Sequence, residues 1–313
     1  MTFDENCWKV KTLILEINTM INLLLLLALG LQFRAIDGIQ CGTATFQPAT
    51  FTSQRDVSLG KRIVGGRSAT PGSWPWQVML KKDGEVKCGG SILYNNVILT
   101  AAHCLKGETN LQAWEVYVGK YHKESTDETE RRHTIERFIP HEKFNSRTLD
   151  NDIGLLVVKE PIEFTDYVQP ICLDQPKPPK NRVRPPKGQC FTTGWGETKG
   201  TGHDDVLKEV QLDRKIPLLC NQFLFGPKLK SPPKEKGTAF CAGYQNADAC
   251  YGDSGGPYSC KIGGKWYIKG IVSSGRDCGQ PGWYGIYANV PMFIGWINRQ
   301  ITLLDLTLLL RSL

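Results

Sequence analysis

Short β-type runs recur along the chain from residue 74 onward, separated by glycine, asparagine and proline. Such runs between turn-forming residues are typical of a barrel or a sandwich of strands. The runs are Trp76–Leu80, Ser91–Leu99, Trp114–Val118, Ile153–Val158, Gln189–Gly194, Val206–Leu212, Trp266–Ser273 and Gly285–Val290. Helical periodicity is clear only near the end, at Met292, Phe293, Trp296, Ile297 and Ile301. The pattern predicts an all-β domain that ends in an α-helix.

The cysteines indicate an oxidising compartment. Eleven of them spread from Cys7 to Cys278, and none forms a Cys-x-x-Cys pair. This usage favours disulfides over a zinc or redox site, so we expect no metal and no cofactor. The net charge of +7 comes without a nucleic-acid-binding motif or a dominant basic run, so we expect no nucleic-acid partner.

The N-terminal 38 residues contain one apolar block, residues 21–33, which is short for a membrane span. Glu16 and Asn18 before it oppose membrane burial. We interpret the block as part of a secretory signal peptide cleaved within Ala35–Gly38, which predicts a secreted, extracellular protein. Its removal also removes Cys7 and leaves ten cysteines. A retained signal-anchor is the alternative.

Three further segments frame the β-rich body, which we place at residues 63–302. Residues 39–62 have little periodicity and are predicted to be a flexible pro-segment that ends in Lys61-Arg62. Residues 174–188 are rich in proline and basic residues and are predicted to connect two β halves. The leucine-rich tail 303–313 is too short to span a membrane, and we expect it to continue the terminal helix. Contact of this tail with a membrane surface is the less favoured alternative.

The stretch Asp248–Pro257 carries a candidate nucleophile, Ser254, between Asp253 and a Gly-Gly pair. A serine hydroxyl attacks a carbonyl only if a base takes its proton and donors stabilise the oxyanion that forms. Flanking glycines let the backbone turn sharply and approach a substrate. Gly-Asp-Ser-Gly is also an ordinary turn sequence, so this stretch alone leaves both interpretations open.

Two other segments supply the partners that Ser254 needs. Leu99–Cys104 offers His103 among small residues, and histidine is the natural proton carrier near neutral pH. Asp150–Leu156 offers Asp152 directly before an apolar strand, where a partly buried carboxylate needs a partner such as an imidazole N–H. Each residue alone has a structural explanation, but the three together indicate a catalytic set.

With these motifs the chain resembles the trypsin-like (chymotrypsin-fold) serine proteases over about residues 63–302, with a somewhat acrosin-like character. The motifs stand in the family's order and are Ile63–Gly66, Thr100–Cys104, Asn151–Leu155 and Gly252–Pro257. The resemblance implies two six-stranded antiparallel β-barrels followed by a C-terminal α-helix.

The resemblance also implies roles for individual residues. Ser254 would be the nucleophile, His103 the general base and then acid, and Asp152 the group that orients His103. The backbone N–H groups of Gly252 and Ser254 would form the oxyanion hole.

Activation and specificity are implied in the same way. Cleavage after Arg62 would free the α-amino group of Ile63, which would then pair with Asp253, so the chain is expected to be a zymogen. Asp248 at the base of the primary pocket would select Arg or Lys, with Gly275 and Gly285 keeping the pocket open. Ala249 next to Asp248 lacks a hydroxyl for a lysine ammonium, so we expect Arg to be preferred.

The family's disulfide pairing uses all ten remaining cysteines, although the sequence alone does not fix the connectivity. The implied pairs are Cys41–Cys172, Cys88–Cys104, Cys190–Cys260, Cys220–Cys241 and Cys250–Cys278.

The sequence departs from the family pattern at several positions, of which three bear on specificity and metal binding. Ser274 replaces the usual tryptophan after the serine that opens the substrate-binding strand, and Tyr251 replaces a polar residue at the pocket rim. These changes leave the extended specificity open. Lys120 stands where calcium-binding relatives carry an acid, so we expect no calcium site there.

The predicted function is therefore a secreted Arg/Lys-specific serine endopeptidase. Its expected partners are protein or peptide substrates with Arg or Lys at the cleavage site, and protein protease inhibitors. Two alternatives stay open. One is a catalytically weak or inactive homologue that acts as a binding or regulatory protein, and the other is a membrane-tethered protease.

Overall fold

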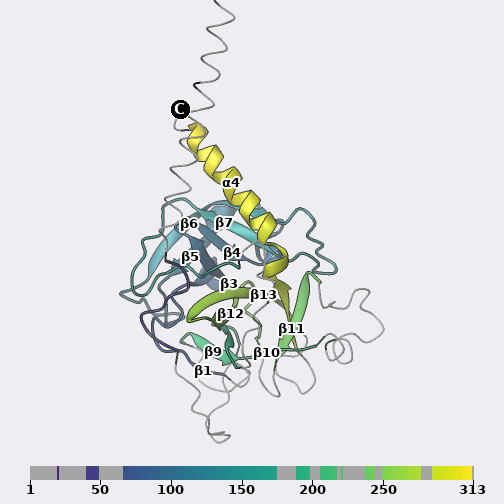
Figure 1. Ribbon diagram of the computed structural model, residues 1–313. Helices are drawn as coiled ribbons and strands as arrows, with labels where there is room; N and C mark the ends of the chain where they lie inside the picture. The colour runs from purple at the N-terminus through teal and green to yellow at the C-terminus, as the bar shows by residue number, and fades with distance from the viewer. Residues whose placement is uncertain are drawn as a thin grey trace, which may run out of the picture. The chain divides into compact units, whose positions relative to one another are not determined.

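The computed structural model describes residues 20, 40–48, 66–174, 188–197, 205–216, 220, 237–243, 249–275 and 284–311. The chain divides into two compact units, Met1–Gln40 and Cys41–Leu313, and all the strands lie in the second (Figure 1). The predicted cleavage site at Arg62, the connector beyond Asp174 and nearly all of the predicted signal peptide fall outside the described residues.

The first group of strands forms a closed antiparallel barrel in the order β2-β3-β4-β7-β6-β5. Its interior is apolar, since Val78, Leu80, Ile92, Ile98 and Val116 are fully buried. Closure leaves no unpaired strand edge. The strands are β2 (Gln77–Lys82), β3 (Glu85–Tyr94), β4 (Val97–Thr100), β5 (Trp114–Val118), β6 (Arg131–Pro140) and β7 (Gly154–Val158).

The second group forms one eight-stranded sheet in the order β1-β9-β8-β12-β13-β14-β11-β10. Only Leu212 separates β9 from β10, so the segment 208–214 pairs with β8 through β9 and with β11 through β10. The sheet therefore curls back on itself. The strands are β1 (Arg67–Ser68), β8 (Cys190–Gly194), β9 (Lys208–Gln211), β10 (Asp213–Arg214), β11 (Ala239–Gly243), β12 (Pro257–Ile262), β13 (Lys265–Ser274) and β14 (Gly285–Asn289).

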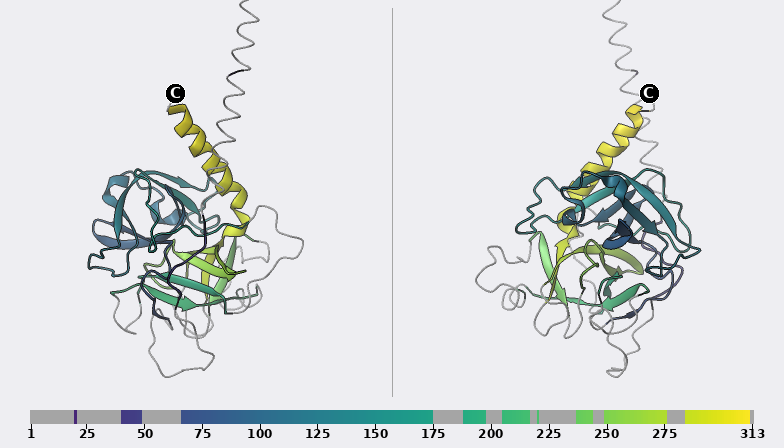
Figure 2. Two further views of the ribbon diagram at one scale, coloured as in Figure 1. Left: turned by 60° about the vertical axis from the view of Figure 1, so that its left-hand side comes forward. Right: turned by 180° about the vertical axis from the view of Figure 1, so that it is seen from behind.

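Helices are few among the described residues. The short helix α2 (Ala102–Leu105) follows β4, the 3-10 turns are η1 (Leu111–Ala113) and η2 (Val290–Met292), and α4 (Ile294–Arg311) runs on from the second sheet. Figure 2 shows the two groups of strands beside one another, with α4 leaving the domain. None of the described helices is long and apolar enough to cross a membrane. The expected mostly-β architecture with a terminal helix is confirmed.

The local predictions differ from the structure in a few places. The run Ser91–Leu99 contains a turn at Asn95-Asn96, which divides it into β3 and β4. Strand β6 was not predicted. Its exposed positions include the charged Arg132 and Glu136, and the buried Ile135 between them is too little apolar signal to indicate a strand.

Aromatic residues pack the two halves together. Trp74 lies between them, with ring centroids 4.8 Å from Trp266 and 5.4 Å from Phe191, both of the second sheet. Trp76 is fully buried at the start of β2 and donates its indole N–H to Ser259 Oγ of β12 at 3.2 Å. Aromatic pairs of this kind add about 0.5–1.5 kcal/mol each beyond area burial. The relative position of the two halves is therefore fixed by packing.

The first part of the predicted pro-segment, residues 41–48, docks on the domain. Cys41 is bonded to Cys172, and the Gly42 carbonyl accepts the Trp266 N–H at 2.9 Å. Gly42 has φ +69°, and a Cβ there would lie 2.4 Å from Trp266 O. Phe46 packs on Tyr167 with ring centroids 4.9 Å apart. The sequence predicted that the whole segment 39–62 is flexible. Contacts with residues far away in the chain, such as those of Cys41 and Phe46, produce no periodic pattern in the sequence.

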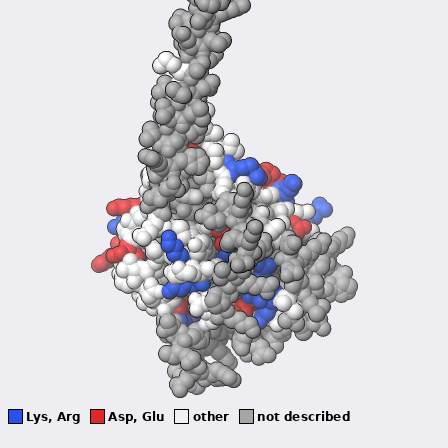
Figure 3. All heavy atoms as spheres, in the orientation of Figure 1, with Lys and Arg blue, Asp and Glu red and all other residues white. Residues whose placement is uncertain are grey.

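Charges of both signs are interspersed on the face seen in Figure 3, with no extended single-sign surface among the residues coloured there. Local ion pairs among the described residues include Arg132–Glu115 and Lys82–Glu108.

A buried histidine in the first barrel predicts how stability responds to acid. Burial lowers the pKa of His133 below its ordinary 6.5, against opposing effects of Glu160. Below pH 6.5 the unfolded chain therefore binds a proton that the folded chain resists, and stability falls by up to about 1.4 kcal/mol per pH unit. We expect the melting temperature to drop less between pH 7.5 and 5.5 in His133→Phe than in the unaltered protein. Parallel pH profiles of the two proteins would contradict this account.

Candidate active site

The strongest polar cluster joins His103 of α2 to Asp152, just before β7. The His103 backbone N–H donates to Asp152 Oδ1 at 2.9 Å, and His103 Nδ1 lies 2.7 Å from Oδ2. Asp152 is 1% exposed, whereas the His103 side chain keeps 27% of its surface. A buried carboxylate thus faces one side of the imidazole, and the other side remains accessible.

Ser273 of β13 completes the surroundings of Asp152. Its hydroxyl donates to Asp152 Oδ2 at 2.6 Å from the second group of strands. With three donors, the buried charge is satisfied as burial requires. Sequence reasoning noted Ser273 only as the start of a strand and missed this hydrogen bond. It could have been anticipated in general terms, because a buried Asp152 carboxylate needs more donors than His103 supplies.

The Cys88–Cys104 disulfide fixes the helix that carries His103 to strand β3. Cys88, His103 and Cys104 lie close enough to suggest a metal site. Their two sulfurs are bonded to each other, however, and a metal binds the thiolate. The cluster is therefore better explained as a structural clamp.

Ser254 lies next to this clamp, across the junction of the two halves. Its carbonyl oxygen accepts the Gly89 N–H at 2.7 Å and lies 3.7 Å from Cys104 Sγ, which in turn is 4.0 Å from His103 Nε2. Gly255 has φ +81°, and a Cβ there would lie 2.3 Å from Thr100 Oγ1. Glycine is required for this close approach.

Asp253 is a buried carboxylate with two backbone donors. Its Oδ1 accepts the Gly196 N–H at 2.8 Å, and its Oδ2 accepts the Cys250 N–H at 2.9 Å. Burial raises the pKa of Asp253 to about 6, against the lowering effect of these bonds. Among the described residues it has no ion pair.

Glycines make the room for Asp253. A Cβ on Gly194 would lie 2.0 Å from Asp253 Oδ1, and one on Gly196 would lie 2.6 Å from its Cγ. Between them, Trp195 donates its indole N–H to Tyr121 O at 2.9 Å and fixes this segment to the first half. Sequence reasoning did not single out these residues, although Gly-Trp-Gly at the end of a strand marks a close backbone approach.

Of the remaining predicted site residues, Gly252 directly precedes Asp253 and has φ +96°, and the others divide into two sets. Gly275 follows β13 and Gly285 begins β14, and the pairing of Ser274 with Ile286 places the two glycines side by side at the end of that ladder. Asp248, Arg62 and Ile63 lie outside the described residues.

Four of the five implied disulfides are present, namely Cys41–Cys172, Cys88–Cys104, Cys190–Cys260 and Cys220–Cys241. Cys250 is also disulfide-bonded, and its implied partner Cys278 lies outside the described residues.

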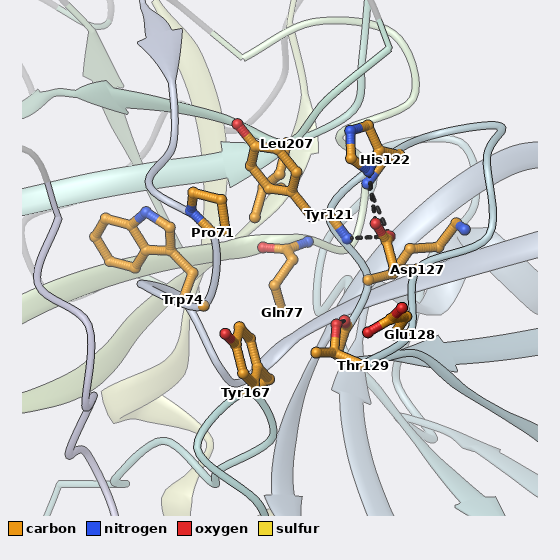
Figure 4. Close-up of a pocket in the computed structure, with 13 residues that line it drawn as sticks. Pro71, Trp74, Gln77, Tyr121, His122, Asp127, Glu128, Thr129, Tyr167 and Leu207 are labelled. Carbon is orange, nitrogen blue, oxygen red and sulfur yellow. Dashed lines mark hydrogen bonds and ion pairs between the residues drawn. The ribbon is translucent and has the colours of Figure 1, made fainter.

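A cavity of about 320 Å³ lies away from this cluster and includes none of the predicted catalytic residues (Figure 4). Trp74, Gln77, Tyr121 and Leu207 line it, and on one side His122 Nδ1 lies 2.6 Å from Asp127 Oδ1. Nearby, the buried Lys120 ammonium donates to Ser125 O and Glu130. In the loop of residues 120–130, the positive charge beside Glu130 is therefore the Lys120 ammonium group.

Comparison with known proteins agrees with this arrangement. The model of the family described as Trypsin matches residues 63–297. Transmembrane protease serine 5 of Homo sapiens is 36% identical over 246 residues, which are 77% of this chain and 52% of that protein. The chain thus spans about half the length of this relative. Coagulation factor IX of Oryctolagus cuniculus is 33% identical over 243 residues, 75% of this chain and 83% of that protein.

The Ser273 hydrogen bond predicts a specific loss of stability. Ser273→Ala removes one of three donors from a buried carboxylate, which costs about 1–3 kcal/mol. We expect the free energy of unfolding in urea to fall by this amount. The exposed Ser125→Ala is the control and should change it by less than about 0.5 kcal/mol. Equal unfolding free energies for the two variants would show that Ser273 does not stabilise Asp152.

Proposed function

The chain belongs to the trypsin family of serine proteases, and from this premise we propose that it is a secreted endopeptidase made as a zymogen. In this proposal, cleavage after Arg62 activates it, and it hydrolyses peptide bonds after Arg and, less well, Lys. The observation that carries the proposal is the buried Asp152 carboxylate, bonded to His103 from one half and to Ser273 from the other.

In the proposed reaction, Ser254 Oγ attacks the substrate carbonyl while His103 Nε2 takes its proton. Asp152 accepts from Nδ1, which holds the ring in the tautomer that leaves Nε2 free to act as a base and stabilises the cation that forms. The N–H groups of Gly252 and Ser254 hold the oxyanion. His103 then protonates the leaving amine. In the second half, water attacks the acyl carbon while His103 takes its proton, and His103 returns that proton to Ser254 Oγ as the acid product leaves.

The proposed activation switch is supported by the surroundings of Asp253. Among the described residues Asp253 accepts from two backbone N–H groups, and an ammonium group would stabilise this buried carboxylate further. Ser68 pairs with Lys208, and Lys208 pairs with Gly194, which contacts Asp253. Two strand spacings amount to about 10 Å. Ile63 is five Cα-to-Cα steps from Ser68, which span up to about 17 Å, so a freed Ile63 ammonium can reach Asp253.

The proposed specificity depends on Asp248, Gly275 and Gly285. The adjacent glycines at the end of the β13–β14 ladder support a pocket open to a long side chain. An acid at its base would select a cation, and Ala249 beside it offers no hydroxyl to a lysine ammonium, so Arg would be cleaved faster.

The proposed organisation is a leader at 1–38, a pro-segment at 39–62, a protease domain at 63–302 and a tail at 303–313. The Cys41–Cys172 disulfide would keep the pro-segment attached after activation. The disulfides support an extracellular location. Protein substrates and protein protease inhibitors are the partners that this family implies.

A membrane-tethered protease is a second candidate. One observation favours it, because the human relative is named a transmembrane protease. N-terminal sequencing of the protein in the medium and of the protein that stays with the cells separates the two. A start after residue 35 in the medium supports secretion, and cell-bound protein that keeps the apolar block 21–33 supports tethering.

The enzyme proposal predicts activity that depends on both cleavage and Ser254. The full chain should gain activity on Arg-containing peptides after cleavage at Arg62, and Ser254→Ala should lose at least about a thousandfold. Uncleaved protein and Arg62→Gln treated with the same protease are the controls. Confirmed cleavage without Ser254-dependent hydrolysis would instead favour the non-catalytic homologue.

The raised pKa of Asp253 predicts how cleavage changes stability. Between pH 3.8 and about 6 the folded precursor keeps a proton that the unfolded chain has lost. Its stability therefore falls as pH rises through this window, by roughly 3 kcal/mol. A paired Ile63 ammonium should recover much of this loss.

We therefore expect cleavage after Arg62, made in Ser254→Ala to prevent self-digestion, to raise the melting temperature more at pH 7.5 than at pH 5. With Asp253→Asn added, this pH dependence should vanish. A cleavage effect that is the same at both pH values, with Asp253 intact, is inconsistent with the switch.

A further inference from the structure

The segment just after the predicted cleavage site is already fixed in the uncleaved chain. Arg67 and Ser68 form β1, which pairs with β9. The Ala69 N–H donates to Leu207 O at 2.9 Å, and the Tyr121 hydroxyl donates to Ala69 O at 3.0 Å. Tyr121 and Leu207 are seen on the walls of the cavity in Figure 4. The described chain is thus held from Gly66 onward, three positions beyond Ile63.

A buried ion pair provides the firmest of these contacts. Arg67 Nε and Nη2 each lie 2.7 Å from Glu209 Oε1. The Glu209 side chain is fully buried, whereas the Arg67 side chain keeps 31% of its surface. The guanidinium therefore contacts a carboxylate that is completely removed from solvent.

Glu209 is itself tied to the rigid junction of the two halves. Its Oε2 accepts the Trp74 indole N–H at 2.7 Å, and Trp74 packs on Trp266. Burial raises the pKa of Glu209, against the lowering effects of Trp74 and Arg67. Burying a carboxylate costs desolvation free energy, and a strand residue that only fills space would not need an acidic side chain. Its position beside β1 therefore suggests a directing role.

The register connects this pair to the activation switch. Glu209 of β9 pairs with Arg67 of β1 on one side and with Thr193 of β8 on the other. The residue after Thr193 is Gly194, which contacts Asp253. Gly66 is also buried and lies in a β-bridge, so only three residues, Ile63 to Gly65, lie between this anchored segment and the new N-terminus. Each additional residue to be ordered would cost about 1–2 kcal/mol of backbone entropy.

We propose that Arg67 and Glu209 are positioning residues for activation. Their ion pair holds β1 in place before cleavage, so that the new Ile63 ammonium is delivered to Asp253. This inference rests on the proposed function and deepens it, because it names the side chains that set how completely the cleaved chain adopts the active form.

The test compares full-length Arg67→Gln, Arg67→Lys and Arg67→Gln/Glu209→Gln with the unaltered protein, all cleaved after Arg62. The double variant leaves no unpaired buried charge, so it retains the fold if the single variant does not. Arg132→Gln, which breaks the Arg132–Glu115 pair on the first barrel, is the matched control.

Three readouts separate positioning from general stability. For Arg67→Gln and the double variant we expect kcat on an Arg peptide to fall about tenfold with KM little changed. The alkaline loss of activity should move toward the ordinary α-amino pKa of about 8. Carbamylation of the Ile63 α-amino group by cyanate should become faster. Arg67→Lys should recover part of each change, and Arg132→Gln should match the unaltered protein.

Each outcome decides a different claim. If the unaltered protein is active and its α-amino group is protected, and the folded double variant behaves identically, the positioning role is wrong while the proposed function stands. If the cleaved unaltered protein is inactive and its α-amino group reacts freely with cyanate, the proposed function fails, and the positioning role fails with it.

Discussion

The Asp253 carboxylate is the group on which the proposed site depends. It is buried directly before Ser254, and its two donors come from Cys250 and from Gly196 of the neighbouring segment. The fold leaves space for it only because Gly194 and Gly196 carry no side chains. A carboxylate whose pKa is raised to about 6 by burial is a stored electrostatic cost. A nearby ammonium group would relieve it, and this is the physical basis of the proposed switch.

The groups of the proposed catalytic site come from different halves of the domain, so their geometry depends on the junction between the halves. His103 lies on α2 and Asp152 just before β7, whereas Ser254 lies before β12 and Ser273 in β13. The Trp74 cluster, the Gly89–Ser254 hydrogen bond and the Trp195–Tyr121 hydrogen bond cross that junction. Rigid packing of this kind orients side chains closely enough for catalysis, since an error of about 1 Å costs roughly a hundredfold in rate.

Local sequence patterns were sufficient for some features and insufficient for others. Alternating apolar runs gave the β architecture and the terminal helix, and short motifs gave His103, Asp152 and Ser254. The Ser273–Asp152 hydrogen bond and the Arg67–Glu209 pair could not be predicted, because each joins residues more than a hundred positions apart through strand register. A charged residue such as Glu209 is normally expected on the surface. Only the pairing of β1 with β9 shows why it is buried.

The most direct measurement is a crystal structure of the Ser254→Ala chain after cleavage at Arg62. The account predicts that the Ile63 nitrogen lies about 2.7–2.9 Å from an Asp253 carboxylate oxygen, a charge-assisted contact, with Arg67 still bonded to Glu209. An Ile63 ammonium in solvent, with Asp253 still held only by the Gly196 and Cys250 N–H groups, would contradict it.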